Sequence, residues 1–297
     1  MIPPSIPNNT PPAAQPGRVG SLREDDIWLP GTQQPKGRGP EPLQVKTSTT
    51  DQILCWADDA QQTFRTELDQ LVSSAFPHMP EEELAIFIDD YFQQPGEHLS
   101  RQMILCRNPR GQLIGSTIFD RGMVKYHGQW IEGIYLITRT ILPKYQGRGL
   151  GKTLAAKILM EVHPDVLFVT CAQSAALHSW VKLPSKGMIS GYDVYPRLEQ
   201  REGEEVVITV PPEDQDFLFT VFPQIYRGVV VGEKRSGLER TMSTLTASLV
   251  RKDIFGEAYD FTPWEKHGRQ DALAKALGVR STDGILVMFK KQSLSLA

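Results

Sequence analysis

The residues whose types and spacing point most directly to chemistry are the three glycines of the segment 146–152. This segment reads Gln-Gly-Arg-Gly-Leu-Gly-Lys, and it lies between a long strand-like run and a pattern typical of a helix. Glycine lets the backbone adopt positive φ and approach a ligand closely, and the free N–H groups at the start of a helix favour an anion. The segment therefore predicts a site for a phosphate or pyrophosphate group.

Three kinds of phosphate site use such a loop, and a glycine turn without a ligand is a fourth interpretation. Gly151-Lys152 ends like a P-loop, but the leading glycine of GxxxxGK[ST] would fall on Gln146. Gly147 and Gly149 begin a dinucleotide-binding GxGxxG, whose third glycine would fall on Lys152. The pattern Q/R-x-x-G-x-G/A is the one that the segment matches throughout.

This last pattern resembles motif A of the GNAT acyltransferase superfamily. Ile141-x-Pro143 stands at the family's V-x-P position, just before the loop. The segment 108–115, Asn-Pro-Arg-Gly-Gln-Leu-Ile-Gly, resembles the family's hairpin between its second and third strands. The resemblance covers residues 43–183, about half of the chain.

The resemblance implies that the chain binds acetyl-CoA as a co-substrate. The backbone of residues 139–141 would hold the pantetheine arm in the manner of an added strand, and a backbone N–H near Ile141 would hold the oxyanion. The amides of residues 147–152 would hold the pyrophosphate. The donor-site residues that it implies are Arg139, Thr140, Ile141, Gln146, Gly147, Arg148, Gly149, Leu150, Gly151, Lys152, Gln173 and Trp180.

One position departs from the family pattern. Residues 173–180 read Q-x-x-A-x-x-x-W where the family usually has N-x-x-A-x-x-x-Y, so that Trp180 replaces the tyrosine that serves as the acid. An indole N–H does not act as an acid at neutral pH. His178, the serines of the same segment and Tyr192 are the other candidates for the proton donor to the CoA thiolate, and the thiolate can also leave without one.

Attack on a thioester requires a neutral amine, so the reaction also needs a base that removes a proton from the amine. Glu132 is the first candidate, because it lies on the long strand 14 residues before Gln146, one residue from the position of a glutamate in some relatives. An exposed strand glutamate is the alternative interpretation. Tyr135 on the same strand is a candidate for holding a water molecule, or else a core residue. Cys171 is interpreted as a buried apolar residue rather than as a nucleophile.

The elements that must position these residues follow an α/β order. The fold class that we expect is a GNAT-like central mixed, mostly antiparallel sheet flanked by helices, with an additional C-terminal α+β insertion. The spacing of apolar residues and the turn signals predict strands at 43–45, 53–56, 103–106, 112–119, 130–142 and 166–169 and helices at 64–75, 80–91, 149–159 and 175–181.

The chain divides into three parts by composition. Residues 1–42 hold ten of the 22 prolines and are predicted to form a disordered tail. Residues 43–200 are the acyl-CoA-binding domain that the GNAT resemblance implies. Residues 201–297 form a substrate or partner region, either an insertion or a separate domain. Its predicted elements are a strand at 205–210, an apolar run at 214–231 that Pro223 keeps from being one helix, helices at 242–250 and 263–277, and a closing strand at 284–290.

Composition and charge argue against some classes of protein. The 297 residues carry a net charge of −3, which argues against a dedicated nucleic-acid binder. No apolar run is long enough to cross a membrane, no signal peptide is visible, and three scattered cysteines suggest a reducing compartment. We expect a cytoplasmic protein without a metal; a secreted protein with an N-terminal tail is the alternative.

Together these patterns predict an N-acetyltransferase that moves an acetyl group from acetyl-CoA to a primary amine. The acceptor is a protein lysine or N-terminus, or a small amine. Two other functions stay open: a CoA-binding sensor or partner-binding module without turnover, and an ATPase-like protein that binds phosphate through Gly151-Lys152-Thr153.

Overall fold

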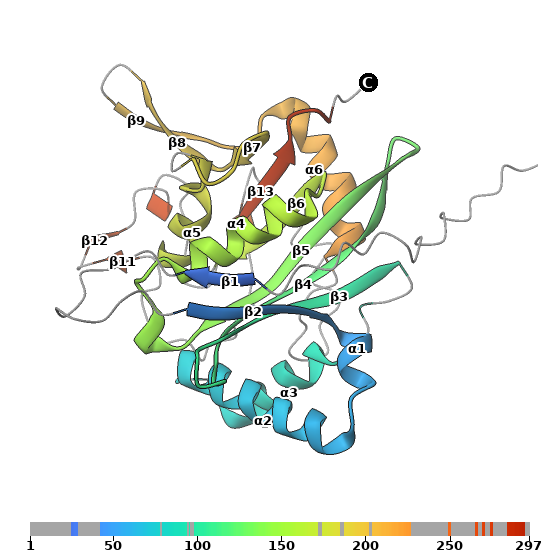
Figure 1. Ribbon diagram of the computed structural model, residues 1–297. Helices are drawn as coiled ribbons and strands as arrows, with labels where there is room; N and C mark the ends of the chain where they lie inside the picture. Colours follow the sequence, from blue (N-terminus) through green and yellow to red (C-terminus); the bar gives the residue numbers. More distant parts are fainter. Residues whose placement is uncertain are drawn as a thin grey trace, which may run out of the picture.

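A nine-stranded sheet forms the centre of the molecule (Figure 1). The computed structural model describes residues 25–28, 42–77, 79–93, 95, 98–171, 174–184, 187–201, 204–226, 249–250, 265–266, 269–270, 274–275 and 284–294. In spatial order the strands are β1 (Asp25–Trp28), β2 (Pro42–Thr49), β3 (Leu99–Arg107), β4 (Leu113–Tyr126), β5 (Gln129–Ile141), β6 (Val166–Cys171), β13 (Gly284–Lys291) and β10 (Leu249–Val250), with β7 (Tyr192–Tyr195) also paired to β13. Every pair is antiparallel except β5–β6.

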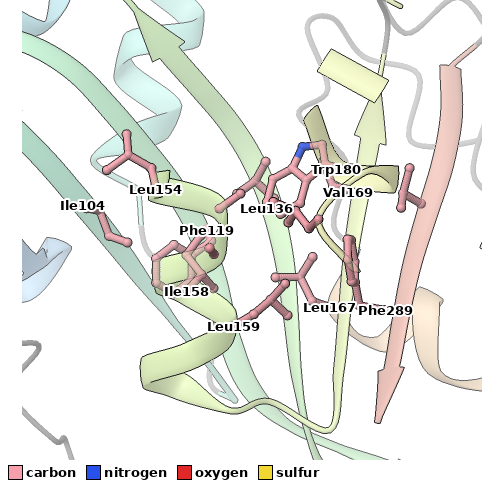
Figure 2. Close-up of a cluster of buried hydrophobic side chains, with 14 of the residues drawn as sticks. Ile104, Phe119, Leu136, Leu154, Ile158, Leu159, Leu167, Val169, Trp180 and Phe289 are labelled. Atoms are coloured by element: carbon pink, nitrogen blue, oxygen red, sulfur yellow. The ribbon is translucent and has the colours of Figure 1, made fainter. Parts of the chain in front are cut away.

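Two helices cover one face of the sheet, which we call the α4 face. They are α4 (Leu150–Val162) and α5 (Ser174–Val181). Strand side chains alternate between faces, so Ile134 and Leu136 of β5 join this core, whereas Tyr135 between them points to the other face. Figure 2 shows this core, in which side chains of α4 and of the sheet meet Trp180 and Phe289.

Three further helices cover the opposite face, which we call the α6 face. They are α2 (Asp58–Ala75), α3 (Glu81–Tyr91) and α6 (Pro212–Ile225). The first two pack on one part of this face and α6 packs on another, and Ile137 of β5 contacts both cores. In the described part of the chain, the remaining elements are the short helix α1 (Thr50–Leu54), the 3-10 helix η1 (Pro143–Tyr145) and the two-stranded sheets β8–β9 (Arg197–Arg201, Glu204–Ile208) and β11–β12 (Glu265–Lys266, Arg269–Gln270). The strand expected at 53–56 is wrong, because α1 runs through Leu54.

The predicted fold class is confirmed: a mixed, mostly antiparallel sheet is flanked by helices. The closing strand expected at 284–290 is β13, and it lies beside β6 in the main sheet. The strand expected at 205–210 is β9. The continuous apolar run 285–289 was sufficient to predict β13, and the alternation of apolar residues predicted β9.

Four predictions in the terminal parts are wrong. Residues 25–28 form β1, inside the segment that was expected to lack structure, because β2 offers them an unpaired edge. Residues 249–250 pair with β13, and 265–266 pair with 269–270, where helices were expected. The sequence has Gly268 between the last two strands, and glycine is costly inside a helix. Pro42, the last residue of the predicted tail, begins β2, and residues 274–275 are helical as expected. The remainder of the tail and of both expected helices lies outside the described residues.

The fourth wrong prediction concerns helix α6. It runs through Pro223, which was expected to interrupt it. The proline lies in the last turn, so only one backbone hydrogen bond is lost before the helix ends at Ile225. Burial of Phe217, Val221 and Phe222 outweighs that loss.

Within the described part of the chain, no helix combines the length and the apolar character needed to cross a membrane.

Candidate functional site

The glycine segment begins helix α4, as the sequence predicts. Gly147 and Gly149 have φ of +72° and +86°, values that favour glycine. The carbonyl oxygen of Gly149 accepts hydrogen bonds from the amides of Lys152 at 2.9 Å and Thr153 at 3.1 Å, which starts the helix. A side chain added at Gly147 or Gly149 would meet open space, so a ligand can approach the backbone there.

Strands β5 and β6 separate next to this helix start. Their parallel pairing runs from Gly133–Val166 to Leu136–Val169 and then stops. Both strands continue, since β5 stays paired with β4 through Ile141 and β6 stays paired with β13 through Cys171. We call this break in the pairing, between residues 137–141 and 170–171, the β5–β6 opening.

A β-bulge marks the start of the opening. Thr138 is opposite Ile118 and Leu136 is opposite Phe119, so Ile137 has no partner on β4. A bulge inserts one residue, bends the strand and re-aims its side chains. The bend occurs where β5 leaves β6, and it turns the edge of residues 138–141 away from its former partner. An extended ligand can add to such an edge by main-chain hydrogen bonds.

The opening and the helix start adjoin each other. A side-chain atom added at Gly151 would lie 3.3 Å from Ile141 Cδ1 and 3.4 Å from Arg139 Nε. The Gln146 side-chain amide donates a 2.8 Å hydrogen bond to the carbonyl oxygen of Ile141, which ties the loop to the end of β5. A molecule lying along β5 would therefore reach the glycine loop with its far end.

Arg139 and Trp180 also lie together at this place. The Arg139 Nη1 atom donates to the Gly151 carbonyl oxygen at 2.9 Å, and its Cζ lies 4.8 Å from the centre of the Trp180 ring. Trp180 is 1% exposed and contacts Phe289 edge to face. The indole is thus a core residue that supports the arginine.

The predicted catalytic residues do not all come together. Glu132 lies five residues before Ile137, roughly 16 Å along an extended strand from the opening. Its carboxylate accepts a 2.7 Å bond from Arg121, and its backbone N–H donates to Asp165. The Tyr192 hydroxyl donates to the Pro164 carbonyl oxygen at 2.9 Å, at the same end of the sheet. The structure therefore groups Glu132 and Tyr192 with each other, away from the glycine loop.

Tyr135 is closer to the opening, on the α6 face. Its hydroxyl donates to Thr170 Oγ1 at 3.4 Å, and Thr170 is one of the two β6 residues at the opening. The rings of Phe222 and Tyr226 pack against it. Burial raises the pKa of Tyr135 well above its ordinary value, so the phenol is protonated at neutral pH. It can donate a hydrogen bond, but it cannot serve as a base.

Several other predicted residues have simple placements. Leu150 is in the core, the Thr140 hydroxyl is buried, and the Arg148 guanidinium lies over the ring of Tyr145. Lys152 is in the first turn of α4, and His178 is half-buried on α5. Gln173 lies outside the described residues.

A buried ion pair near the opening was missed at the sequence level. Arg101 of β3 donates to both carboxylate oxygens of Asp120 on β4, at 2.8 and 3.1 Å, and also contacts Asp90. Asp120 is 2% exposed and stands opposite Tyr135 across the β4–β5 pair. The signal that could have revealed it was an acid, Asp120, directly after the apolar pair Ile118-Phe119.

No three histidine, cysteine or acidic side chains converge as a metal site in the described residues. Burial raises the pKa of the Cys171 thiol to about 12, and Arg139 opposes that rise. The neutral thiol is therefore the form present at physiological pH, which fits a packing role.

Comparisons with known proteins give partial structural likenesses. No family model and no curated protein sequence matches the chain. A probable N-acyltransferase from Enterococcus faecalis is 15% identical with a TM-score of 0.28, over 43% of this chain and 29% of that one. A histone acetyltransferase HPA2 and related acetyltransferase from Corynebacterium glutamicum is 13% identical with a TM-score of 0.32, over 49% and 89%.

The GNAT family N-acetyltransferase YhbS from Escherichia coli, in complex with CoA, is 14% identical with a TM-score of 0.33, over 50% of this chain and 74% of that one. These scores and identities are low, so we assign the fold from the sheet itself. The order of strands, the one parallel pair among the described strands, the opening and the glycine loop together make the arrangement that the GNAT resemblance implies.

Proposed function

We propose that the chain binds acetyl-CoA and transfers its acetyl group to a primary amine. The observation that carries the proposal is the break in pairing between β5 and β6 directly beside the start of α4. A strand edge that continues into an anion-binding helix start fits a long, linear molecule with a pyrophosphate.

The two parts of the site match the two parts of this donor. The amide groups of a pantetheine arm can pair with the main chain of residues 138–141, and a pyrophosphate can accept hydrogen bonds from the amides of residues 147–151. Lys152 and Arg148 add positive charge to the same loop. ATP has no counterpart of the pantetheine arm, so it would leave the opening empty.

The reaction follows from the chemistry of a thioester. A neutral amine attacks the carbonyl carbon, a C–N bond forms, and the C–S bond breaks so that CoA leaves as a thiolate. The oxyanion that forms in between needs a positioned donor, and we assign that role to a backbone N–H of β5 near Ile141. The acceptor can be a protein lysine, a protein N-terminus or a small amine.

Ligand-induced stabilisation tests the donor. CoA and acetyl-CoA at about a hundred times their Kd should stabilise the protein by about 2.7 kcal/mol in a thermal shift measurement, whereas ATP should not. Absence of a shift with both CoA species would overturn the proposal.

A matched pair of glycine variants locates the site. Gly149→Val fills the open space at the helix start and should abolish the CoA shift. Gly111→Val is the control, because Gly111 has a similar φ of +77° and equally open surroundings in the β3–β4 turn. Both variants should lose stability, but the control should keep the response to CoA.

A CoA-binding sensor is the second candidate, and the burial of Trp180 in the core is the observation that favours it. Release of free CoA from acetyl-CoA, followed with a thiol reagent over a panel of peptides and small amines, separates the two. Amine-dependent release supports the transferase, whereas binding without release with any amine supports the sensor.

A further inference from the structure

Arg139 is held at the β5–β6 opening by three elements. It belongs to β5, its Nη1 atom donates to the Gly151 carbonyl oxygen of α4 at 2.9 Å, and its Nη2 atom donates to the Ser179 hydroxyl of α5. Its guanidinium lies against the Trp180 ring, 4.8 Å from Cζ to the ring centre. The position of the charge is therefore fixed rather than free to move in solvent.

Among the described residues, no carboxylate forms an ion pair with Arg139. Other arginines of the sheet have one: Arg101 pairs with Asp120, Arg107 with Glu67, and Arg121 with Glu132. Arg139 is half-buried, and a charge that loses part of its hydration without gaining a counter-ion is costly. Burial lowers the pKa of Arg139 to about 10, so the group is still a cation at neutral pH.

Cys171 is the last residue of β6, at the end of the opening across from residues 137–141. Burial raises the pKa of its thiol to about 12, and the positive charge of Arg139 offsets only part of that rise. A sulfur atom of a ligand placed in the opening would feel the same positive charge.

We propose that Arg139 stabilises the thiolate of CoA as it leaves in the acyl-transfer step, an inference that rests on the proposed function. The C–S electron pair goes to sulfur, and the guanidinium balances the negative charge by Coulomb attraction and N–H donation. The guanidinium keeps its proton; the proton lost by the amine goes to water, and the released thiolate later takes one from water. No separate acid is needed beside Trp180.

The test compares CoA with desulfo-CoA, which lacks the sulfur. Wild-type protein and the Arg139→Met variant are titrated with both ligands over a range of pH, and the thiolate of bound CoA is followed by its ultraviolet absorbance. In the variant the pKa of the bound thiol should rise by about one unit, which corresponds to about tenfold weaker binding of CoA at high pH. Affinity for desulfo-CoA should change less than about twofold.

Kinetics provide a second measurement. Arg139→Met should lower kcat by about 10- to 100-fold with little change of KM, because the interaction forms only as charge develops on sulfur. Arg139→Lys keeps a positive charge and should recover part of the shifted thiol pKa. Arg110→Met, in the exposed turn between β3 and β4, is the matched control and should behave as wild type.

Each alternative has a distinct result. Equal loss of CoA and desulfo-CoA binding in Arg139→Met would show that the arginine only supports the loop, and would overturn the inference. An unchanged thiol pKa would do the same. Wild-type protein that binds neither ligand would instead overturn the proposed function. If Arg139→Met does not fold, Ser179→Ala, which removes one anchor of the guanidinium, should raise the thiol pKa by a smaller amount.

Discussion

At the scale of single residues, burial decides which reactive groups are available. Three cysteines have different surroundings: Cys55 is exposed, whereas Cys106 and Cys171 are buried in the sheet. Burial raises the pKa of both buried thiols to about 12. Since the thiolate is the reactive form, Cys171 is unreactive at neutral pH although it lies at the opening, in agreement with its interpretation from the sequence as a buried apolar residue.

Alkylation tests this difference. At about pH 8, iodoacetamide should modify Cys55 and leave the two buried thiols unmodified in the native protein, as measured by mass spectrometry of peptides. The Cys55→Ser variant should then take up no label until denaturant is added. Labelling of Cys171 in the native protein at this pH would contradict the buried placement of its thiol.

Among single residues, the glycines of the site could be predicted from the sequence, whereas the side-chain contacts could not. The glycines of the loop were identified because glycine has a conformational meaning at any place in a fold. The side-chain partners of Glu132 and Arg139 were not, since Arg121 and Ser179 meet them only through the sheet and α5. The role of Glu132 as a base stays a prediction that the ion pair does not favour.

At the scale of elements, close approach of strands fixes the register of the sheet. A Cβ added at Gly122 of β4 would lie 2.2 Å from the His98 carbonyl oxygen and 2.6 Å from Leu99 Cδ2. The first of these atoms belongs to the backbone that leads into β3, so it cannot move without shifting the β3–β4 pair. At Gly115 of the same strand, the nearest atom would be 3.5 Å away, which is an ordinary contact.

Alanine substitution measures this constraint. Gly122→Ala should lower the free energy of unfolding by about 3 kcal/mol, the upper range for overpacking. Gly115→Ala should change it by less than about 1 kcal/mol. Urea unfolding of the two variants checks the difference, and equal stabilities would show that β3 yields at no cost.

Elements with a continuous apolar side were predictable, whereas the opening was not. The strand and helix around the glycine loop follow from periodicity in the sequence. Where β5 and β6 stop pairing depends on the bulge at Ile137 and on packing against both cores of the α6 face. The two-residue strands β10, β11 and β12 are too short to show any periodicity of apolar residues in the sequence.

At the scale of the whole molecule, β13 joins the two faces. Val287 and Phe289 belong to the core of the α4 face, and Leu286 and Met288 belong to that of the α6 face. Because the strand inserts beside β6, residues from the end of the described chain complete the sheet that carries the site. The sequence suggested such a closing strand, but the identity of its neighbours depends on contacts across more than a hundred residues.

Alanine substitution of two phenylalanines, one buried and one exposed, compares what burial contributes to the free energy of unfolding. Phe289→Ala should cost about 3–5 kcal/mol of unfolding free energy, because Phe289 is fully buried in β13. Phe219→Ala, on the exposed side of α6 at 37% exposure, should cost less than about 1 kcal/mol. Chemical denaturation followed by near-ultraviolet circular dichroism measures both, and similar values would mean that β13 adds little to the core.

The place of β13 also has a consequence for protein synthesis. Strand β6 is made long before β13, with residues 172–283 between them. During that interval one edge of β6 lacks the partner that covers it in the folded protein, and an open edge invites pairing with other chains. The nascent chain would therefore gain from a chaperone that binds this edge, and the sheet that carries the β5–β6 opening would be complete only after translation of β13.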